Sequence, residues 1–236
     1  MSPGGLAGSP STVFGLGIAL FLVVGGAGFW LQRKRRERLM GWARLNGWTY
    51  LSSDPSLVDL STRHPFGQGR ARRTSEVLRG RFQGRDALSF VYSWKTGSGK
   101  SESTHTAHVV ALALPAYLPI VEVTPEGVLD RIATAVGVQD LRFESEAFNR
   151  AFRVQAYDER TAYAVIHPRL MERLLQPDAR GEAWRTDGTW ILSWRSGATD
   201  VVSLAARFGL LSAVVASVPR HVWQDHGYDP LAPDLR

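Results

Sequence analysis

Residues 96–101 read TGSGKS, which matches the end of a phosphate-binding loop, and they follow a predicted strand as that motif requires. The full pattern needs a glycine five residues before Gly99, where this chain has Trp94. The segment behind Ser101 is again strand-like, so no predicted helix offers its N-terminus to an anion. We therefore interpret the string as an exposed hairpin loop rich in glycine and serine.

Histidines and cysteines give no candidate metal centre. His105 and His108 lie three residues apart, a spacing that joins ligands on a helix but separates them on a strand, and this stretch is predicted to be a strand. The chain has no cysteine, which removes thiolate metal sites and cysteine nucleophiles. It also lacks the GxSxG elbow of many serine hydrolases. We expect no metal, no cofactor and no recognisable catalytic residue.

Two nearby carboxylates are the remaining acid–base candidates. Glu144 and Glu146 are two positions apart. The helix dipole favours negative charge at a helix start, so we interpret both as residues of a helix N-terminus, paired locally with Arg150 and Arg153. An enzyme would instead have to gather dispersed groups, such as these glutamates, Glu122 and one histidine, in one pocket.

An apolar segment near the N-terminus is the strongest signal in the sequence. Residues 12–31 carry no charged side chain, and as a helix they span about 30 Å, the thickness of the bilayer hydrocarbon. Basic residues follow this segment while residues 1–11 carry no charge, the reverse of the order in a cleaved signal peptide. We expect a single-pass helix over residues 12–31 in the cell membrane. Residues 1–11 would form a short extracytoplasmic tail and the remainder would be cytoplasmic, because basic residues stay on that side.

A basic cluster directly behind the apolar segment dominates the charge of the chain. The whole sequence carries 28 basic and 22 acidic side chains, a net charge of +6. Residues 33–38 hold five of the basic and one of the acidic side chains, which leaves +2 for the rest. No domain-wide basic face is implied, so we expect no nucleic-acid partner. Basic side chains beside a bilayer attract anionic lipid headgroups, and the predicted membrane-surface contacts are Arg33, Lys34, Arg35, Arg36 and Arg38.

Periodicity behind the cluster predicts an α+β domain of antiparallel hairpins and short helices. Residues 32–48 form a basic juxtamembrane helix with its stop at Asn46-Gly47, residues 49–223 the cytosolic domain and residues 224–236 a flexible C-terminal tail. Two hairpins are expected, over residues 77–94 and 184–194, and their similar aromatic second strands leave a duplicated half-domain or chance similarity open. The other expected elements are strands over residues 106–114, 119–123 and 140–143, a helix from Pro125 to Gly137, a helical turn passing into a strand over residues 148–156, two short helices divided at His167-Pro168, and a closing helix over residues 201–218.

The arginines between the juxtamembrane helix and the first hairpin allow two interpretations. Arg63, Arg70, Arg72 and Arg73 surround the segment HPFGQG. A domain held close to the bilayer would let them face lipid headgroups. The glycine and proline content favours a solvated irregular loop.

Three segments carry a resemblance to known sequences: FESEAFNRAFRV at residues 143–154, HPRLME at residues 167–172 and VEVTPEG at residues 121–127, together with the N-terminal anchor and its basic residues. In these segments the chain resembles a family of uncharacterised single-pass membrane proteins of high-GC actinobacteria. The use of 25 arginines against 3 lysines fits a GC-rich genome. More distantly, the chain resembles a wider bacterial family of membrane-associated domains of unknown function. The resemblance implies a fold and a membrane location and assigns no functional residue.

These patterns together predict a membrane-anchored cytosolic module that binds or scaffolds rather than catalyses. Its partners would be the lipid bilayer, anionic headgroups at the basic cluster, and a protein that the sequence does not identify. The alternative is a membrane-tethered enzyme with an active site assembled from dispersed polar residues. Gly15 and Ala19 form one small-xxx-small step, which would let two helices approach, so a homodimer is a further option.

Overall fold

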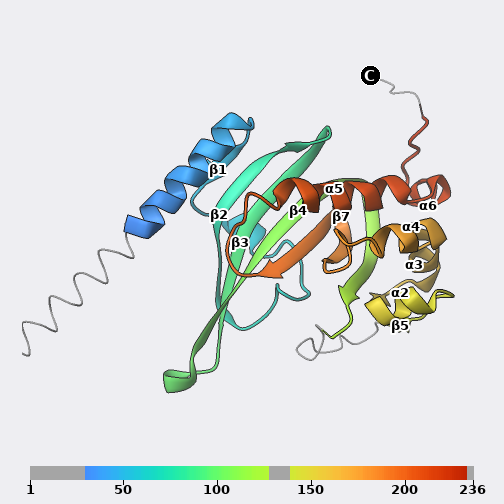
Figure 1. Cartoon of the computed structure of the whole chain (residues 1–236), viewed down its shortest axis with the longest axis horizontal. Coiled ribbons are helices and arrows are strands. Elements are labelled where there is room, and N and C mark those ends of the chain that lie inside the picture. The colour runs from blue at the N-terminus through green and yellow to red at the C-terminus, as the bar shows by residue number, and fades with distance from the viewer. Residues whose placement is uncertain (1–29, 128–138, 233–236) are drawn as a thin grey trace, which may run out of the picture.

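The computed structural model describes residues 30–127 and 139–232, in which an antiparallel sheet is covered by helices (Figure 1). The predicted α+β class is confirmed. Among the described residues, no helix has the length and apolar character needed to span a membrane. The predicted membrane segment lies outside them except for residues 30–31, and so does most of the helix predicted behind Pro125.

The sheet contains seven strands, and most of the helices are short. The strands are β1 (Thr49–Leu51), β2 (Arg70–Phe82), β3 (Arg85–Thr96), β4 (Ser103–Pro125), β5 (Gln139–Leu141), β6 (Phe152–Ala156) and β7 (Ala183–Ser196). The helices are η1 (Pro55–Leu57), η2 (Gly99–Ser101), α2 (Glu146–Ala151), α3 (Glu159–Val165), α4 (Pro168–Leu174), α5 (Leu204–Ser217) and α6 (Arg220–Asp225). Residues 30–45 are also helical.

The long strand β4 organises the sheet. The order is β1-β2-β3-β4-β6-β5, and β7 pairs with β4 in addition. The first half of β4 pairs with β3 and its last residues pair with β6, while β7 follows both halves. The strands predicted over residues 106–114 and 119–123 are therefore parts of one strand, with a register shift between Ala113 and Leu118.

The first predicted hairpin is confirmed. Phe82 pairs with Arg85, and the two residues between them, Gln83 and Gly84, have φ angles of 49° and 81°. Positive φ at both central positions is the geometry of the tight turns that match the twist of a hairpin. Glycine adopts such an angle without steric cost, which is why the turn forms at this point.

The second predicted hairpin is wrong. Residues 183–196 form one continuous strand, β7, which pairs with β4 from Val123↔Trp184 to Ala107↔Ser196. Gly188 has a φ of 66°, but it lies opposite Leu118 at the register shift of β4 instead of turning the chain. A strand of 23 residues gives β7 a partner along its whole length, so the local turn signal becomes an irregularity. The similarity on which a duplicated half-domain depended is thereby lost.

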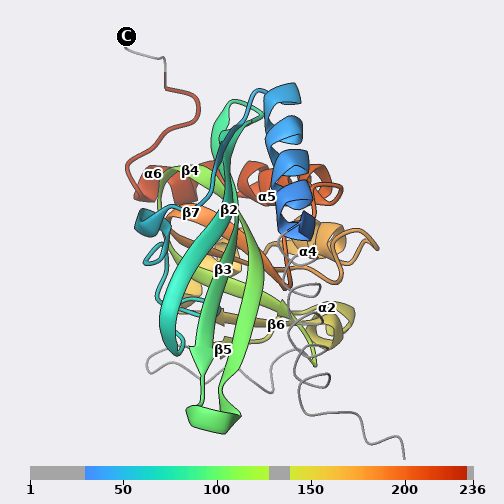
Figure 2. The ribbon, with the colours of Figure 1, turned by 90° about the vertical axis from the view of Figure 1, so that its left-hand side faces the viewer.

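The sheet buries both faces. Alternate residues of β3, Leu88, Phe90 and Tyr92, enter one core cluster, while Ala87 enters the other. The helix α5 lies across the face that carries Ala87 (Figures 1 and 2). The face that carries Leu88, Phe90 and Tyr92 is covered by the segment before β2. There the ring centroid of the fully buried Phe66 lies 4.7 Å from that of Tyr92. The HPFGQG segment is therefore irregular but packed, and the prediction of a solvated loop is corrected.

Most predicted helices are confirmed. The Ser145, Asp158 and His167 side chains accept hydrogen bonds from backbone N–H groups at the starts of α2, α3 and α4. Pro168 begins α4 and so divides the two short helices where predicted. Specific contacts continue past residue 223, because Arg220 donates to Asp229 over 2.8 Å.

Candidate functional site

The helix over residues 30–45 is docked on the domain at its C-terminal half. Leu39 and Ala43 are buried in the core, and Trp42 packs edge-to-face on Trp48 with 5.6 Å between ring centroids. The last helical residue is Leu45, and Gly47 follows with a φ of 70°, so the helix ends at Asn46-Gly47 as predicted. Spacing of four residues places the two buried side chains on one face, and this face attaches the helix to the sheet.

The five predicted membrane-surface residues are divided by the structure. Arg33, Lys34, Arg36 and Arg38 are exposed. Arg35 instead points to the domain, where its Nε donates to Glu76 Oε1 over 2.5 Å and its Nη2 donates to the Thr199 carbonyl over 2.9 Å. One residue of the basic cluster therefore fixes the helix to the sheet. The remaining four lie at the surface, where Arg33 pairs with Glu37 over 3.0 Å.

The TGSGKS string lies in an exposed loop between β3 and β4, as predicted. Gly97 and Gly99 have positive φ angles, and Ser101 donates to the Ser98 carbonyl over 2.9 Å. The loop closes on itself through η2, whose three residues lead directly into β4. It has neither the wrapped backbone nor the following helix of a phosphate-binding loop.

The other sequence candidates are not brought together. His108 is buried and His105 is half-buried beside Trp94, on opposite faces of β4. Glu146 stands in the first turn of α2, which confirms its position at a helix start. Arg153 pairs with Asp140 instead of the glutamates, so the expected local pairing by this arginine is wrong. No hydrogen bond or ion pair within the described residues joins Glu122 to either Glu144 or Glu146.

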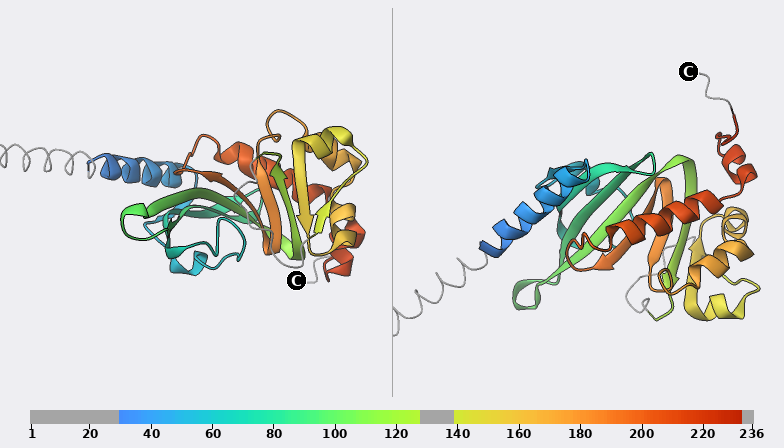
Figure 3. Two further views of the ribbon diagram at one scale, coloured as in Figure 1. Left: turned by 90° about the horizontal axis from the view of Figure 1, so that it is seen from below. Right: turned by 45° about the horizontal axis from the view of Figure 1, so that its top comes forward.

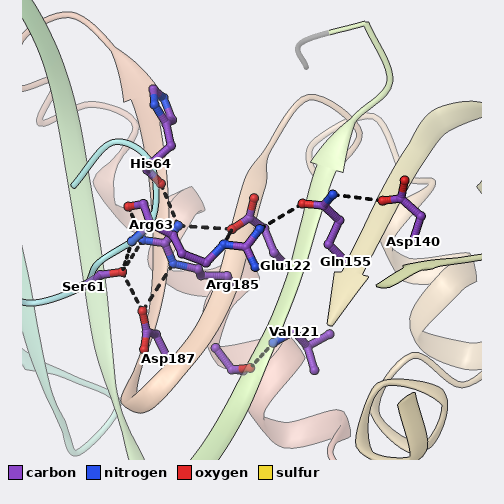
Figure 4. A network of polar contacts seen from close by, with 10 residues as sticks. Ser61, Arg63, His64, Val121, Glu122, Asp140, Gln155, Arg185 and Asp187 are labelled. Atoms are coloured by element: carbon purple, nitrogen blue, oxygen red, sulfur yellow. Dashed lines mark hydrogen bonds and ion pairs between the residues drawn. The ribbon is translucent and has the colours of Figure 1, made fainter. Parts of the chain in front are cut away.

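A buried ionic cluster joins the irregular segment before β2 to the centre of the sheet (Figure 4). We call it the Arg185 cluster; its members are Ser61, Arg63, Glu122, Arg185 and Asp187. Arg185 Nη1 donates to Glu122 Oε2 over 3.2 Å, and its Nη2 donates to Ser61 Oγ over 2.6 Å. Arg63 Nε lies 3.4 Å from the same oxygen of Glu122. Two guanidinium groups and two carboxylates therefore balance each other inside the protein.

The environment of the Arg185 cluster indicates a structural role. Arg185 is fully buried and Glu122 is 2% exposed. Burial lowers the pKa of Arg185, and the charges of Glu122 and Asp187 oppose this shift. Arg63 extends the contacts outward through Gln155, which donates to Asp140 over 2.9 Å. Glu122 already accepts from a guanidinium in a water-excluded position, so this carboxylate is poorly placed to abstract a proton from a substrate.

A second buried cluster lies between the sheet and α5. We call it the Arg207 cluster; its members are His108, Glu182, Ser193, Arg195 and Arg207. Arg207 Nη1 donates to His108 Nδ1 over 3.2 Å, and its Nη2 donates to Ser193 Oγ over 3.1 Å. Arg195 pairs with Glu182, which lies 3.6 Å from Arg207 Nε. Because His108 Nδ1 accepts this bond, the imidazole is neutral and Nε2 carries the proton that it shares with Ser89.

Both clusters were missed by reasoning from the sequence. A weak signal existed, because Arg185 follows Trp184 within a strand-like run and Arg207 precedes Phe208 within a helical one. A charged residue in the buried register of an apolar element needs a buried partner. The partner Glu122 comes from a strand more than sixty positions away, so the sequence alone could not identify it.

The arginines of the segment before the first hairpin also separate. Arg63 is buried in the Arg185 cluster, so the prediction that it faces lipid or solvent is wrong. Arg70, Arg72 and Arg73 begin β2 and are exposed. Arg70 donates to Glu102 over 2.5 Å across the sheet. All three arginines therefore lie at the surface beside the β3–β4 loop, where Arg70 is paired with Glu102 and Arg73 donates to Ser93 over 3.2 Å.

Comparison with known proteins adds a fold neighbour. No family model matches this sequence, and no curated protein matches it. Among solved structures, the chain is similar to the crystal structure of the mycobacterial trehalose monomycolate transport factor A, with a TM-score of 0.54 and 16% identity over 77% of this chain and 90% of that chain. At this identity the likeness shows the fold alone. A mycobacterial neighbour agrees loosely with the resemblance to actinobacterial proteins.

Proposed function

We propose that this chain is a membrane-held binding or scaffolding module that serves transport at the cytoplasmic surface of the cell membrane. The observation that carries the proposal is the docked helix. Arg35, Leu39 and Ala43 fix residues 30–45 to the sheet, and the apolar residues 12–31 precede this helix directly in the sequence. A membrane segment joined to such a helix makes the domain follow the direction of that helix, whereas a flexible linker would let the domain rotate independently.

Three further observations support binding over catalysis. Glu122, which an active site of dispersed residues would have used, is paired inside the Arg185 cluster. The fold neighbour is named as a transport factor for trehalose monomycolate, and we extend a transport-associated role to this chain on the shared fold. Four exposed cations, Arg33, Lys34, Arg36 and Arg38, supply a surface for anionic headgroups.

Membrane extraction and topology test the proposal. The full chain with a C-terminal reporter is expected in the membrane pellet after an alkaline wash. A fluorescent protein at that end should be active and a phosphatase that needs the exterior should be inactive. Replacement of the four exposed cations by glutamine, combined with new arginines in residues 1–11, should invert the orientation. Release by the alkaline wash, or an active exterior phosphatase on the unaltered chain, contradicts the proposal.

Complementation of a deletion strain separates a scaffold from an enzyme. Glu144 and Glu146 are exposed at the start of α2. A scaffold should tolerate Glu144→Gln and Glu146→Gln together, since the amides keep the shape of the helix start. An enzyme that used either carboxylate for proton transfer would lose about 10² to 10⁴ in rate. Loss of complementation by a stable double variant would favour the enzyme.

A further inference from the structure

A second basic surface lies at the end of the β3–β4 hairpin. It contains the start of β2 and the hairpin loop, and its members are Arg70, Arg72, Arg73, Lys95 and Lys100. The register brings them together, since Arg70 pairs with Lys95 and Arg73 pairs with Ser93. Residues 67–73 and 95–105 hold these five basic side chains and one acidic side chain, Glu102. We call this group the hairpin-tip surface; its formal charge is +4, from five minus one.

The hairpin-tip surface and the docked helix point to the same side of the molecule. Figure 1 and the left panel of Figure 3 show the β3–β4 loop, in green, projecting beyond the rest of the domain on the side where the helix, in blue, has its N-terminal end. In Figure 2 the helix runs downward to its N-terminal end, in dark blue, and the same loop is the lowest described part of the domain. A bilayer entered from the N-terminal end of the docked helix would therefore lie on the side to which this loop projects.

Part of the positive charge at the tip is already paired, and part of it is free to meet an external anion. Glu102 accepts from both Arg70 and Lys95, at 2.5 and 2.6 Å. Lys100 is exposed in η2, and neither it nor Arg72 makes an ion pair with any described residue. The loop offers no large apolar side chain, so its chemistry suits phosphate and other headgroup anions rather than insertion into hydrocarbon.

We propose that the hairpin-tip surface is a second contact with anionic lipid headgroups, which acts together with the basic helix to hold the domain against the bilayer at two points. This inference rests on the proposed membrane anchorage. A helix alone fixes one point and leaves the domain free to tilt with it. A second cationic point removes this freedom, with each basic side chain near the surface contributing about 1 kcal/mol.

The natural absence of cysteine makes a direct test simple. Single cysteines are introduced into the full chain by Ser98→Cys at the tip and by His221→Cys on α6, which lies at the opposite end (Figure 1). Each carries a fluorescent donor, and the chain is placed in lipid nanodiscs that hold an acceptor on the headgroups. With anionic lipid present, energy transfer should be strong from position 98 and weak from position 221. It should fall at position 98 in zwitterionic discs and at raised salt.

Charge variants define the cause of the contact. Arg72→Gln with Lys100→Gln should shift the equilibrium from contacting to free tips by about 30-fold, from two charges at the cited value per charge. Arg44→Gln, at an exposed site on the other end of the docked helix, should leave the transfer unchanged. Equal transfer from positions 98 and 221 in anionic discs overturns the inference but leaves the anchorage intact. Equal transfer in anionic and zwitterionic discs also overturns it. A chain that does not enter the discs overturns both.

Discussion

We predict that His108 makes the stability of this protein depend on pH. The side chain is 2% exposed, its Nδ1 accepts from Arg207 and its Nε2 donates to Ser89 over 2.9 Å. Burial, with the charge of Arg207 as the next cause, lowers the pKa of His108 from 6.5 to about 3. The folded chain therefore keeps this imidazole neutral through the range in which the unfolded chain binds a proton.

The sign and size of the effect follow from proton linkage. The contribution of His108 to stability is complete above pH 6.5 and is lost as the pH falls toward 3, because only the unfolded state gains the proton in that window. Between pH 7 and pH 5 the free energy of unfolding should fall by about 2 kcal/mol through this residue. His64, whose pKa is lowered to about 4 by burial and by Arg185, should add a loss of similar size.

The change in unfolding free energy between pH 7 and pH 5 can be measured by urea unfolding. The full chain is unfolded in detergent micelles at each pH and followed by tryptophan fluorescence. His108→Gln keeps both hydrogen bonds, since the amide oxygen accepts from Arg207 and the amide nitrogen donates to Ser89, but glutamine does not titrate. The variant should show about 2 kcal/mol less dependence on pH. His221→Gln, at an exposed site, should behave as the natural chain. An unchanged pH dependence in His108→Gln, or a His108 resonance that titrates near pH 6.5, would refute the reasoning.

Three further predictions concern packing and charge. Glu122→Gln leaves two buried guanidinium groups without their shared counter-charge and should lower the unfolding free energy by about 3–5 kcal/mol in the same urea assay. A loss under about 1 kcal/mol would contradict the structural role of the Arg185 cluster. Gly80→Ala places a methyl group against the Trp48 ring and should lower the unfolding free energy by about 1–3 kcal/mol. Gly41→Ala, which meets open space in a helix, should raise it by about 0.5–1 kcal/mol. Equal effects of the two variants would contradict the contact between Gly80 and Trp48. Arg35→Gln should raise the rate of hydrogen exchange in the docked helix about fivefold, because the helix loses about 1 kcal/mol of docking free energy. An equal rise in the exposed control Arg33→Gln would show that Arg35 does not hold the helix to the sheet.

Elements with local signals could be predicted from the sequence. The turn at Gly84, the helix end at Gly47 and the division at Pro168 depend on backbone angles that a few adjacent residues set. Alternating apolar residues predicted the strands of the first hairpin in the same way. These features need no knowledge of what the element packs against, and the structure confirms them.

Gly188 shows where such signals fail. Its positive φ is of the kind that a tight turn uses, and Asp187 precedes it as in many hairpins. The chain nevertheless continues as β7, because β4 offers hydrogen-bond partners on both sides of the glycine. The outcome depended on a strand that lies more than sixty residues earlier, and no window around Gly188 contains that information.

The sequence by itself determined the α+β class, the local turns and caps, and the position of an apolar segment followed by a basic cluster. Only the tertiary structure decided which charges meet solvent and which serve the fold. Arg35 and Arg36 are neighbours in one cluster, yet the first pairs with Glu76 and the second is exposed. Arg63 and Arg185 are buried because Glu122 lies between them. The physical reason is that the cost of burying a charge depends on partners brought from distant strands, whereas turns and helix ends depend on adjacent backbone angles.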